Sequence, residues 1–335
     1  MAVRVAINGF GRIGRNIFRA IREAKRSDIE VVAVNDLGDA AINAHLLKRD
    51  SVHGPYPGTV EAKGDRLVVD GRPVLVTAER DPSKLPWKAN GIEIALECTG
   101  IFTAGSKAKA HLDAGAKKVL ISAPATEVDL TVVYGVNHQD LKAAHTLVSN
   151  ASCTTNCLAL MAMVLHKEIG ILRGYMTTVH AYTGDQPVLD TIHTDPRRAR
   201  AAALSMIPTT TGAAKAVGLV LPELKGKLDG TAIRVPVPNV SLVDLKFDAA
   251  RDTSVEDIHA LVKKHAAGPL KGLLAWTDEP VVSIDMNHTP ASATFDFSGT
   301  QVIAGRFVRV LGWYDNEWGF SNRMADVALA MANAK

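Results

Sequence analysis

Residues 3–21, VRVAINGFGRIGRNIFRAI, join a short apolar run, three spaced glycines and a segment with helical spacing. The run at 3–7 is rich in β-branched residues, which favours a buried parallel strand. Gly9, Gly11 and Gly14 then form the pattern G-x-G-x-x-G. Glycines between a strand and a helix let the backbone approach a pyrophosphate, and the helix start supplies N–H donors for its charge. The stretch predicts the opening of a dinucleotide-binding sheet, with a glycine turn in some other α/β protein as the alternative.

A second apolar run, EVVAVND at 30–36, ends in Asp36, which follows Gly14 by 22 residues. Dinucleotide-binding folds place an acid at this point, where it binds the ribose hydroxyls of the adenosine. A carboxylate accepts a hydrogen bond from a 2′-hydroxyl and repels a 2′-phosphate. We therefore expect the cofactor to be NAD rather than NADP.

Three further apolar runs, at 92–100, 117–125 and 146–150, are predicted strands of the same sheet. The carboxyl ends of parallel strands meet at one edge of a sheet, and ligands bind there. Thr99, Gly100 and Ser122 all fall at such ends, as do residues 149–153. We expect these residues at the ligand-binding edge.

The strand and helix alternation weakens after about residue 170, where longer runs at 231–248 and 305–315 favour a mixed or antiparallel sheet. The predicted fold class is therefore α/β. A Rossmann dinucleotide-binding domain over 1–151 is joined to an α+β domain over 152–315, whose sheet is mixed or antiparallel.

Composition excludes several classes of protein. The chain has 335 residues, of which 47% are hydrophobic and 22% charged, and its net charge is only +3. This is typical of a soluble protein of about two domains, without the strong charge of a nucleic-acid or membrane-surface binder. Three cysteines form no disulfide framework, and the N-terminus lacks a signal-peptide pattern. We expect a cytoplasmic protein with no nucleic-acid or membrane partner.

The segment SNASCTTNCLAL at 149–160 raises the question of reactivity. Cys153 follows a predicted strand end and begins a predicted helix, and the positive end of the helix dipole lowers the pKa of a thiol placed there. Cys157, one turn further on, and Cys98, inside a strand, are expected to be packed core residues. A Cys-x3-Cys pair could bind a metal, but no second Cys or His pair completes a tetrahedral site, so no metal is expected.

A nucleophilic thiol needs a base or a positive neighbour. His180, in YMTTVHAYTGDQ, is the candidate, but the chain has eleven histidines and spacing alone does not choose among them. A lone histidine is more often structural.

The chain resembles the glyceraldehyde-3-phosphate dehydrogenase family over essentially its whole length, through the motifs INGFGRIGR, SNASCTTNCLA, HAYTGDQ, RRARAAA, IPTTTGAAKAV, RVPVPNVS and WYDNEWG. The resemblance implies an NAD-dependent phosphorylating aldehyde dehydrogenase of glycolysis and gluconeogenesis. Cys153 would attack D-glyceraldehyde 3-phosphate, and His180 would act as the base. A hemithioacetal would become a thioester, which inorganic phosphate would cleave to 1,3-bisphosphoglycerate.

The resemblance also implies the binding residues. From the sequence alone, the arginines at 197–200 could equally be a solvated charge run, and the threonines at 209–211 an ordinary helix cap. The residues implied for substrate and phosphate are Ser152, Thr154, Thr183, Asp185, Arg198, Thr211, Gly212 and Arg234. Those implied for the cofactor are Gly9, Gly11, Arg12, Ile13, Gly14, Asp36, Arg80, Ser122 and Asn316.

The family further implies a homotetramer in which the loop at about 180–204 reaches a neighbour's cofactor, and a C-terminal helix at 316–335 that packs back on the first domain. Two departures stand out. Thr191-Ile192 replaces a frequent Leu-Pro, which bears on NAD selectivity, and Phe320 replaces a frequent tyrosine. The alternatives are erythrose-4-phosphate dehydrogenase, with the same Cys–His chemistry, and a non-catalytic dinucleotide-binding regulator.

Overall fold

The structure is a computed structural model that describes residues 2–335 and contains two compact units. One unit comprises the residues up to Ala151 together with Ser321–Lys335, and the other comprises Ser152–Phe320. We expected the returning C-terminal segment to begin at residue 316. In the structure residues 316–320 belong to the second unit instead. The boundary between the units therefore falls within the first turn of the last helix, which begins at Trp318.

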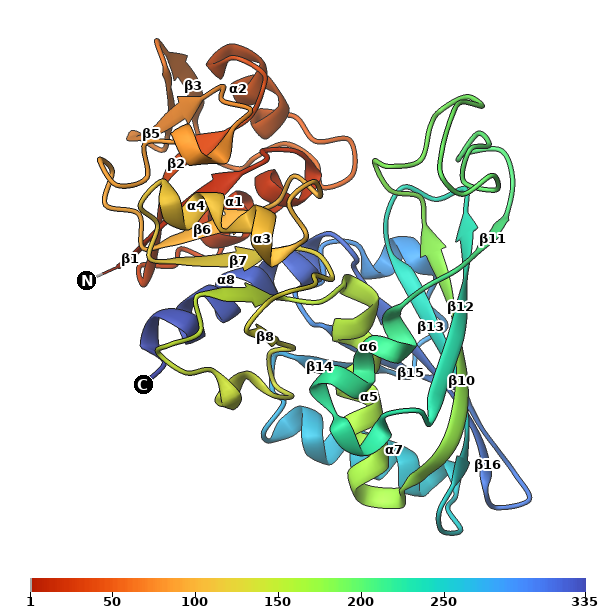
Figure 1. Cartoon of the computed structure of the whole chain (residues 1–335). Coiled ribbons are helices and arrows are strands. Elements are labelled where there is room, and N and C mark those ends of the chain that lie inside the picture. The colour runs from red at the N-terminus through yellow and green to blue at the C-terminus, as the bar shows by residue number, and fades with distance from the viewer. Residues whose placement is uncertain (1) are drawn as a thin grey trace. The chain divides into compact units, whose positions relative to one another are not determined.

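The first unit contains a nine-stranded sheet in the order β3-β4-β5-β2-β1-β6-β7-β9-β8 (Figure 1). All neighbours from β5 to β8 are parallel, while β3 and β4 form an antiparallel extension at one edge. The predicted α/β class is confirmed. The strands are β1 Val3–Asn8, β2 Ile29–Asn35, β3 Val60–Lys63, β4 Arg66–Val69, β5 Arg72–Thr77, β6 Ile94–Glu97, β7 Lys118–Ile121, β8 Leu130–Thr131 and β9 Leu147–Ser149.

Apolar side chains hold the helices of this unit against the sheet. The strand residues Val5, Ile7 and Val34 are fully buried, and Phe10 contacts Phe18 edge to face with ring centroids 5.9 Å apart. This burial follows from near-continuous apolar runs in the central strands. The helices are α1 Arg12–Glu23, α2 Ala40–Lys48, α3 Gly105–Ala108, α4 Ala110–Asp113 and the part of α8 Trp318–Asn333 from Ser321, with 3₁₀ turns η1 Pro82–Lys84 and η2 His138–Asp140.

The glycine turn between β1 and α1 is a close backbone contact. Gly9 has φ +91°, a conformation that side chains other than glycine rarely adopt. A Cβ atom on Gly14 would lie 2.1 Å from the carbonyl oxygen of Gly9. Only glycine at position 14 therefore allows α1 to start so close to the strand, whereas a Cβ on Gly11 would meet nothing within 4 Å.

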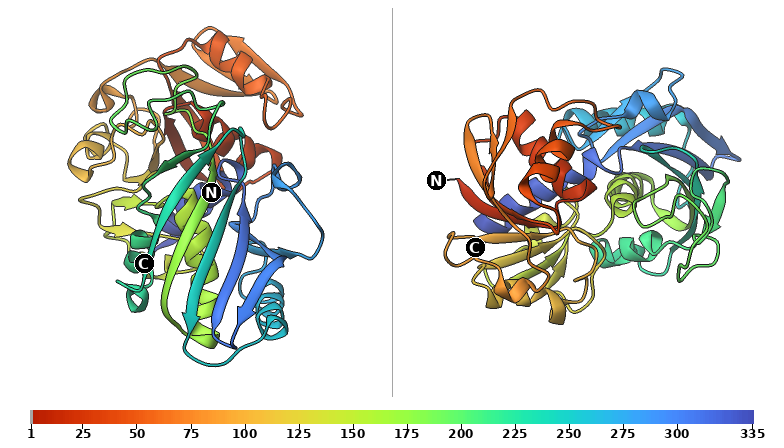
Figure 2. Two further views of the ribbon diagram at one scale, coloured as in Figure 1. Left: turned by 90° about the vertical axis from the view of Figure 1, so that its right-hand side faces the viewer. Right: turned by 90° about the horizontal axis from the view of Figure 1, so that it is seen from above.

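The second unit contains a seven-stranded mixed sheet in the order β11-β12-β10-β13-β16-β15-β14. The pairs β10–β12 and β14–β15 are parallel and the others antiparallel, as the sequence predicted. Figure 2 (left) shows these strands side by side, with α5 behind them. The strands are β10 Ile171–Ala181, β11 Ile207–Thr209, β12 Leu228–Val235, β13 Ser241–Ala249, β14 Leu274–Thr277, β15 Ala293–Ile303 and β16 Phe307–Tyr314. The helices are α5 Cys153–Ile169, α6 Ala213–Val220 and α7 Val255–Ala267, with 3₁₀ turns η3 Pro222–Leu224 and η4 Ser283–Met286.

Helix α5 lies directly on this sheet. Its residues 157–162 are all fully buried, as expected of a helix that is apolar on most faces. A Cβ on Gly312 of β16 would lie 2.3 Å from Sδ of Met161, so glycine lets helix and strand approach. Among residues 2–335, no helix is long and apolar enough to cross a bilayer.

The glycine contact yields a stability prediction. Gly14→Ala places its methyl group against the Gly9 carbonyl, and forced overpacking of this kind costs about 1–3 kcal/mol. Gly11→Ala is the matched control, because its methyl group meets open space. Denaturant unfolding monitored by circular dichroism should show a lower free energy of unfolding for Gly14→Ala only. Equal unfolding of both variants would contradict the proposed packing of the turn.

Candidate active site

A cavity of about 430 Å³ opens in the first unit at the carboxyl ends of β1, β2, β5 and β6. The parallel order of these strands brings together loops that are far apart in sequence. Four of the predicted cofactor residues line it: Gly9, Gly11, Asp36 and Arg80. The other lining residues are Asn8, Asn35, Leu37, Glu79, Cys98, Thr99, Ile101 and Phe102.

Asp36 is held by the turn that it faces. Its Oδ2 accepts from the backbone N–H of Phe10 at 2.8 Å, and its Oδ1 from the N–H of Gly38 at 3.3 Å. Asp36 is only partly exposed and lies at the cavity wall. This geometry suits acceptance from ribose hydroxyls and opposes a phosphate at the same place.

The start of α1 suits an anion. Gly11 is the residue before the helix, and no side chain caps its N–H groups. The helix dipole adds positive potential there. The side chain of Arg12 is instead drawn to Asp50. Burial raises the pKa of Asp50, but Arg12 and the N–H groups of His53 and Val52 outweigh it and lower that pKa to about 2.

The other predicted cofactor residues do not line this cavity. Ile13 and Gly14 lie in the first turn of α1, and Ser122 directly follows β7. Asn316 belongs to the second unit, where it is buried and its Oδ1 accepts from Ser241 Oγ at 2.8 Å. Their contact with a cofactor stays a prediction.

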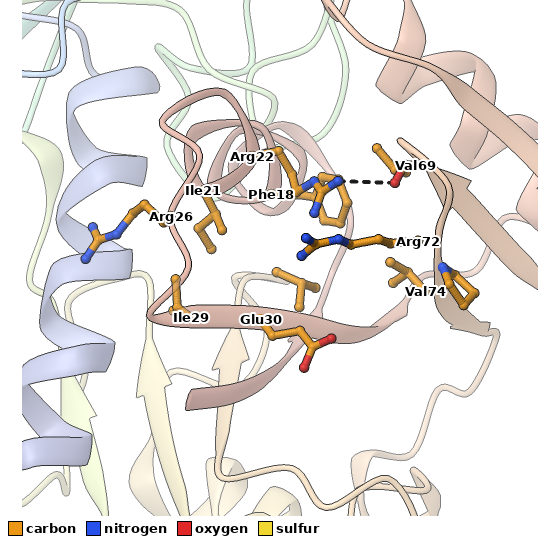
Figure 3. Close-up of a pocket in the computed structure, with 11 residues that line it drawn as sticks. Phe18, Ile21, Arg22, Arg26, Ile29, Glu30, Val69, Arg72 and Val74 are labelled. Carbon is orange, nitrogen blue, oxygen red and sulfur yellow. Dashed lines mark hydrogen bonds between the residues drawn. The ribbon is translucent and has the colours of Figure 1, made fainter. Parts of the chain in front are cut away.

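A second hollow in the first unit lies between α1, β2 and the strands β4 and β5 (Figure 3). Its wall includes Arg22, Arg26 and Arg72, and Arg22 donates to the carbonyl of Val69 at 3.2 Å. The hollow measures only about 40 Å³, which is room for a water molecule or two. It is too small for a dinucleotide, whereas the cavity at the strand ends is about ten times larger and is lined by four predicted cofactor residues.

In the second unit, Cys153 and His180 face each other. Cys153 is the first residue of α5, and the hydroxyl of Ser152 caps that helix by accepting from Thr155 N at 3.0 Å. His180 is the residue before the end of β10. The distance between Cys153 Sγ and His180 Nε2 is 3.5 Å. The structure thus places beside Cys153 the histidine that the family resemblance implies, and its role as the base stays a prediction.

The hydrogen bond of the other ring nitrogen fixes the proton of His180. Nδ1 lies 2.6 Å from the carbonyl oxygen of Ala181, and a carbonyl oxygen can only accept. Nδ1 therefore carries the proton of the neutral ring. Nε2 is left with a lone pair toward the sulfur, so it can take the proton of the thiol.

Burial disfavours the charged form of each member of this pair, the thiolate of Cys153 and the imidazolium of His180. Burial of the sulfur raises the pKa of Cys153, although the Arg234 charge and the Thr154 N–H act in the opposite direction. Burial also lowers the pKa of His180 to about 3, with Arg234 as the next cause. The position of Cys153 at the helix start is therefore opposed by the burial of its sulfur, and the thiol needs the neighbouring base that the sequence predicts. The thiolate has to form by passing its proton to His180, so that the two charges arise together.

Arg234 is the first of two cations at this site. It lies opposite His180 in the parallel pairing of β10 and β12. Its Nη1 donates to the Ala181 carbonyl at 3.1 Å and to Thr183 Oγ1 at 2.6 Å, while its Nε is buried with no partner among the described residues. An unpaired N–H on a buried guanidinium is a position where an anion would be bound.

Arg198 is the second cation. Its Nε donates to Thr209 Oγ1 at 3.0 Å, its Nη2 donates to the carbonyl of Thr210 at 3.1 Å, and its Nη1 lies 3.5 Å from Asp185 Oδ2. Thr183 donates in turn to Asp185, which connects Arg198 to Arg234. Arg198 is thus not a solvated charge but belongs to a hydrogen-bonded network with Asp185, Thr183 and Arg234. The sequence alone left these two possibilities open.

The remaining predicted phosphate residues differ in accessibility. Thr211 Oγ1 accepts from Ala213 N at 3.2 Å, and Gly212, an exposed residue, precedes α6 without a side-chain cap. Thr154 is buried, and its hydroxyl lies 2.8 Å from that of Tyr314. The structure gives the Thr154 side chain a packing role, which sequence reasoning missed, and its phosphate contact remains a prediction.

Comparison with known proteins covers both units. The family model described as the glyceraldehyde 3-phosphate dehydrogenase NAD binding domain matches residues 3–105, and that of the C-terminal domain matches residues 152–316. A glyceraldehyde-3-phosphate dehydrogenase of Xanthobacter flavus is 65% identical over 99% of both chains. The enzymes of Cereibacter sphaeroides and Geobacillus stearothermophilus are 64% and 58% identical, again over 99% of both chains. Identity at this level in both halves places the chain in the glyceraldehyde-3-phosphate dehydrogenase family.

Proposed function

We propose that the chain oxidises D-glyceraldehyde 3-phosphate with NAD and inorganic phosphate to 1,3-bisphosphoglycerate, the reaction that serves glycolysis and gluconeogenesis. The observation that carries this proposal is the Cys153 thiol 3.5 Å from the unprotonated Nε2 of His180, with Arg234 beside both. The relatives that match the full length of the chain carry the name of this enzyme.

His180 supplies the base. Its Nε2 takes the thiol proton as Sγ bonds to the aldehyde carbon, and the imidazolium then protonates the oxygen to give a hemithioacetal. His180 next takes the hydroxyl proton as a hydride leaves the same carbon; NAD, when bound, accepts that hydride. The product is a thioester on Cys153. Inorganic phosphate attacks the thioester carbon, the carbon–sulfur bond breaks, and the sulfur regains its proton from His180.

The thioester explains why phosphate, rather than water, has to be the acceptor. It conserves the energy of the oxidation until phosphate forms the acyl phosphate. Two anions must then be held, the phosphate ester of the substrate and the attacking phosphate. Arg198, Arg234 and Thr183 are proposed for the ester, and Ser152, Thr154, Thr211 and Gly212 for the attacking ion. Asp185, which faces Arg198, keeps that arginine in place.

The family alternatives are weaker. Erythrose-4-phosphate dehydrogenase shares the Cys–His chemistry, but the relatives above carry the glyceraldehyde-3-phosphate name and do not favour it. A regulator without catalysis would not need a thiol paired with a base. We also propose a cytoplasmic location, supported by three free thiols.

We further propose a homotetramer. The loop at 182–206 exposes five large apolar side chains, among them Ile192, which is 100% exposed, and Val188, 83% exposed. A second apolar area, with Tyr175 and Phe307, lies over β10, β13 and β16 around a cavity of about 620 Å³. A tetramer with dihedral symmetry needs more than one such surface.

Assembly is tested by sedimentation equilibrium. Wild type should sediment at about four chain masses, and Ile192→Asp should form smaller species, because a charge would be buried in the interface. Asp65→Asn, on an exposed turn of the first unit, is the control. A monomeric wild type would contradict the tetramer.

The alkylation of Cys153 tests the base. In His180→Asn the thiolate has to form without a proton acceptor beside it, so its pKa rises. The alkylation rate is measured against pH, and the midpoint of this profile should move upward by roughly one pH unit or more. His259→Asn, on α7, serves as the control, and Cys153→Ser identifies the labelled residue. Superimposable profiles for wild type and His180→Asn would remove His180 from this role.

The role of Arg198 is tested by comparing two substrates. A three-carbon aldehyde offers little apolar area, and charge-assisted hydrogen bonds contribute about 1.5–3 kcal/mol each. Arg198→Ala should lower kcat/KM for glyceraldehyde 3-phosphate by roughly 10- to 100-fold but change that for unphosphorylated glyceraldehyde little. Arg200→Ala, an exposed neighbour paired with Asp190, is the matched control. Equal losses on both substrates would show that Arg198 does not bind the phosphate.

A further inference from the structure

The carboxyl ends of β5, β2, β1 and β6 carry a chain of buried polar side chains directly below the dinucleotide cavity. At its centre is Glu97, only 1% exposed, next to His111, which is fully buried. Neither residue takes part in the sulfur chemistry proposed above. Their arrangement raises the question of what a buried acid does beneath a nucleotide site.

One end of the chain fixes the proton of His111. The indole Nε1–H of Trp87 lies 3.0 Å from His111 Nδ1, and an indole N–H can only donate. Nδ1 therefore accepts, and the single ring proton sits on Nε2. That nitrogen lies 3.0 Å from Glu97 Oε2 and donates to it. His111 is thus a neutral partner rather than a counter-ion.

The other end of the chain of polar side chains fixes the orientation of the Asn35 and Asn8 side-chain amides. The backbone N–H of Glu79 donates to Asn35 Oδ1 at 2.9 Å, and Asn35 Nδ2 donates to the Glu79 carbonyl at 2.8 Å. With Asn35 so oriented, its Nδ2 also donates to Asn8 Oδ1 at 2.7 Å. The Asn8 amide is thereby oriented too, and its Nδ2 donates to Glu97 Oε2 at 2.6 Å.

A third branch reaches the same carboxylate. The backbone N–H of Thr99 donates to Glu97 Oε1 at 2.7 Å. The Thr99 hydroxyl accepts from Ile101 N at 3.1 Å and directs its own proton to Glu97 Oε1. Every partner of Glu97 therefore donates, so the group is an ionised carboxylate. None of the described cationic side chains bonds to it.

Burying a charge that lacks a cationic partner costs free energy, and the hydrogen bonds to Glu97 offset part of that cost. The same hydrogen bonds orient the groups that donate them. Four residues of this network, Asn8, Asn35, Glu79 and Thr99, also line the cavity. Resting on the proposed use of NAD, we propose that Glu97 is a positioning residue for the dinucleotide. Its carboxylate, locked by His111 and Trp87, sets the Asn8 amide and the Thr99 turn at the floor of the cavity before the cofactor binds.

The direct test is the dissociation constant of NAD, measured by calorimetry on the full chain. Glu97→Gln keeps the shape but presents an amide to four donors, so Asn8 and Thr99 lose their orientation. The Kd of NAD should rise about 10- to 100-fold. In assays, KM for NAD should rise in parallel, while kcat at saturating NAD and KM for the aldehyde should change less than about twofold.

Two further variants keep the test decisive. Trp87→Phe removes the donor to His111 together with part of a fully buried ring, and Trp87 does not line the cavity. This variant should raise the Kd about three- to tenfold, and it tests the inference even where Glu97→Gln does not fold. Val5→Ala weakens the core of β1 without touching the network, and it should lower the melting temperature but leave the Kd unchanged. An unchanged Kd in folded Glu97→Gln or Trp87→Phe would overturn the inference, as would an equal weakening in Val5→Ala. A wild type that bound no NAD would instead overturn the proposed function.

Discussion

The contact between Cys153 Sγ and His180 Nε2 is the interaction on which the chemistry depends, and the fold of the second unit holds it in place. The sulfur sits on the first residue of α5, and the imidazole sits near the end of β10. Their separation is therefore fixed by how α5 packs on the sheet. Gly312 permits close packing of that helix, and the Ser152 cap fixes where it begins. A shift of this helix along the sheet would separate the acid from its base.

In each unit a buried histidine is held in one tautomer by a hydrogen bond to one of its ring nitrogens. In the second unit the Ala181 carbonyl holds the proton of His180 on Nδ1, which leaves Nε2 ready to accept. In the first unit the Trp87 indole holds the proton of His111 on Nε2, which leaves Glu97 an acceptor. In each case a partner that can only accept or only donate removes the choice of tautomer. The site is thus organised before any ligand binds, so little reorganisation remains for the reaction.

Much of the fold was predictable because it is local in sequence. The β1 strand, the glycine turn and the start of α1 follow each other within twenty residues, and Asp36 directly follows the next strand. Contacts across the sheet were not predictable in this way. No spacing brings Trp87 to His111, or Asn8 to Glu97, because strand order decides those contacts. The bond between Thr154 and Tyr314 is of the same kind. The electrostatics of Cys153 were only partly predictable, since the dipole of α5 can be inferred from sequence but the burial of the sulfur, which raises its pKa, cannot.

The central claim is that oxidation passes through a thioester on Cys153 and that phosphate releases it. Wild type mixed with NAD and glyceraldehyde 3-phosphate, without inorganic phosphate, should be quenched in acid and digested for mass spectrometry. The account predicts one equivalent of NADH and an acyl group on the peptide that contains Cys153, which disappears when phosphate is added before quenching. Steady turnover without phosphate, or NADH formation with Cys153 unmodified, would contradict it.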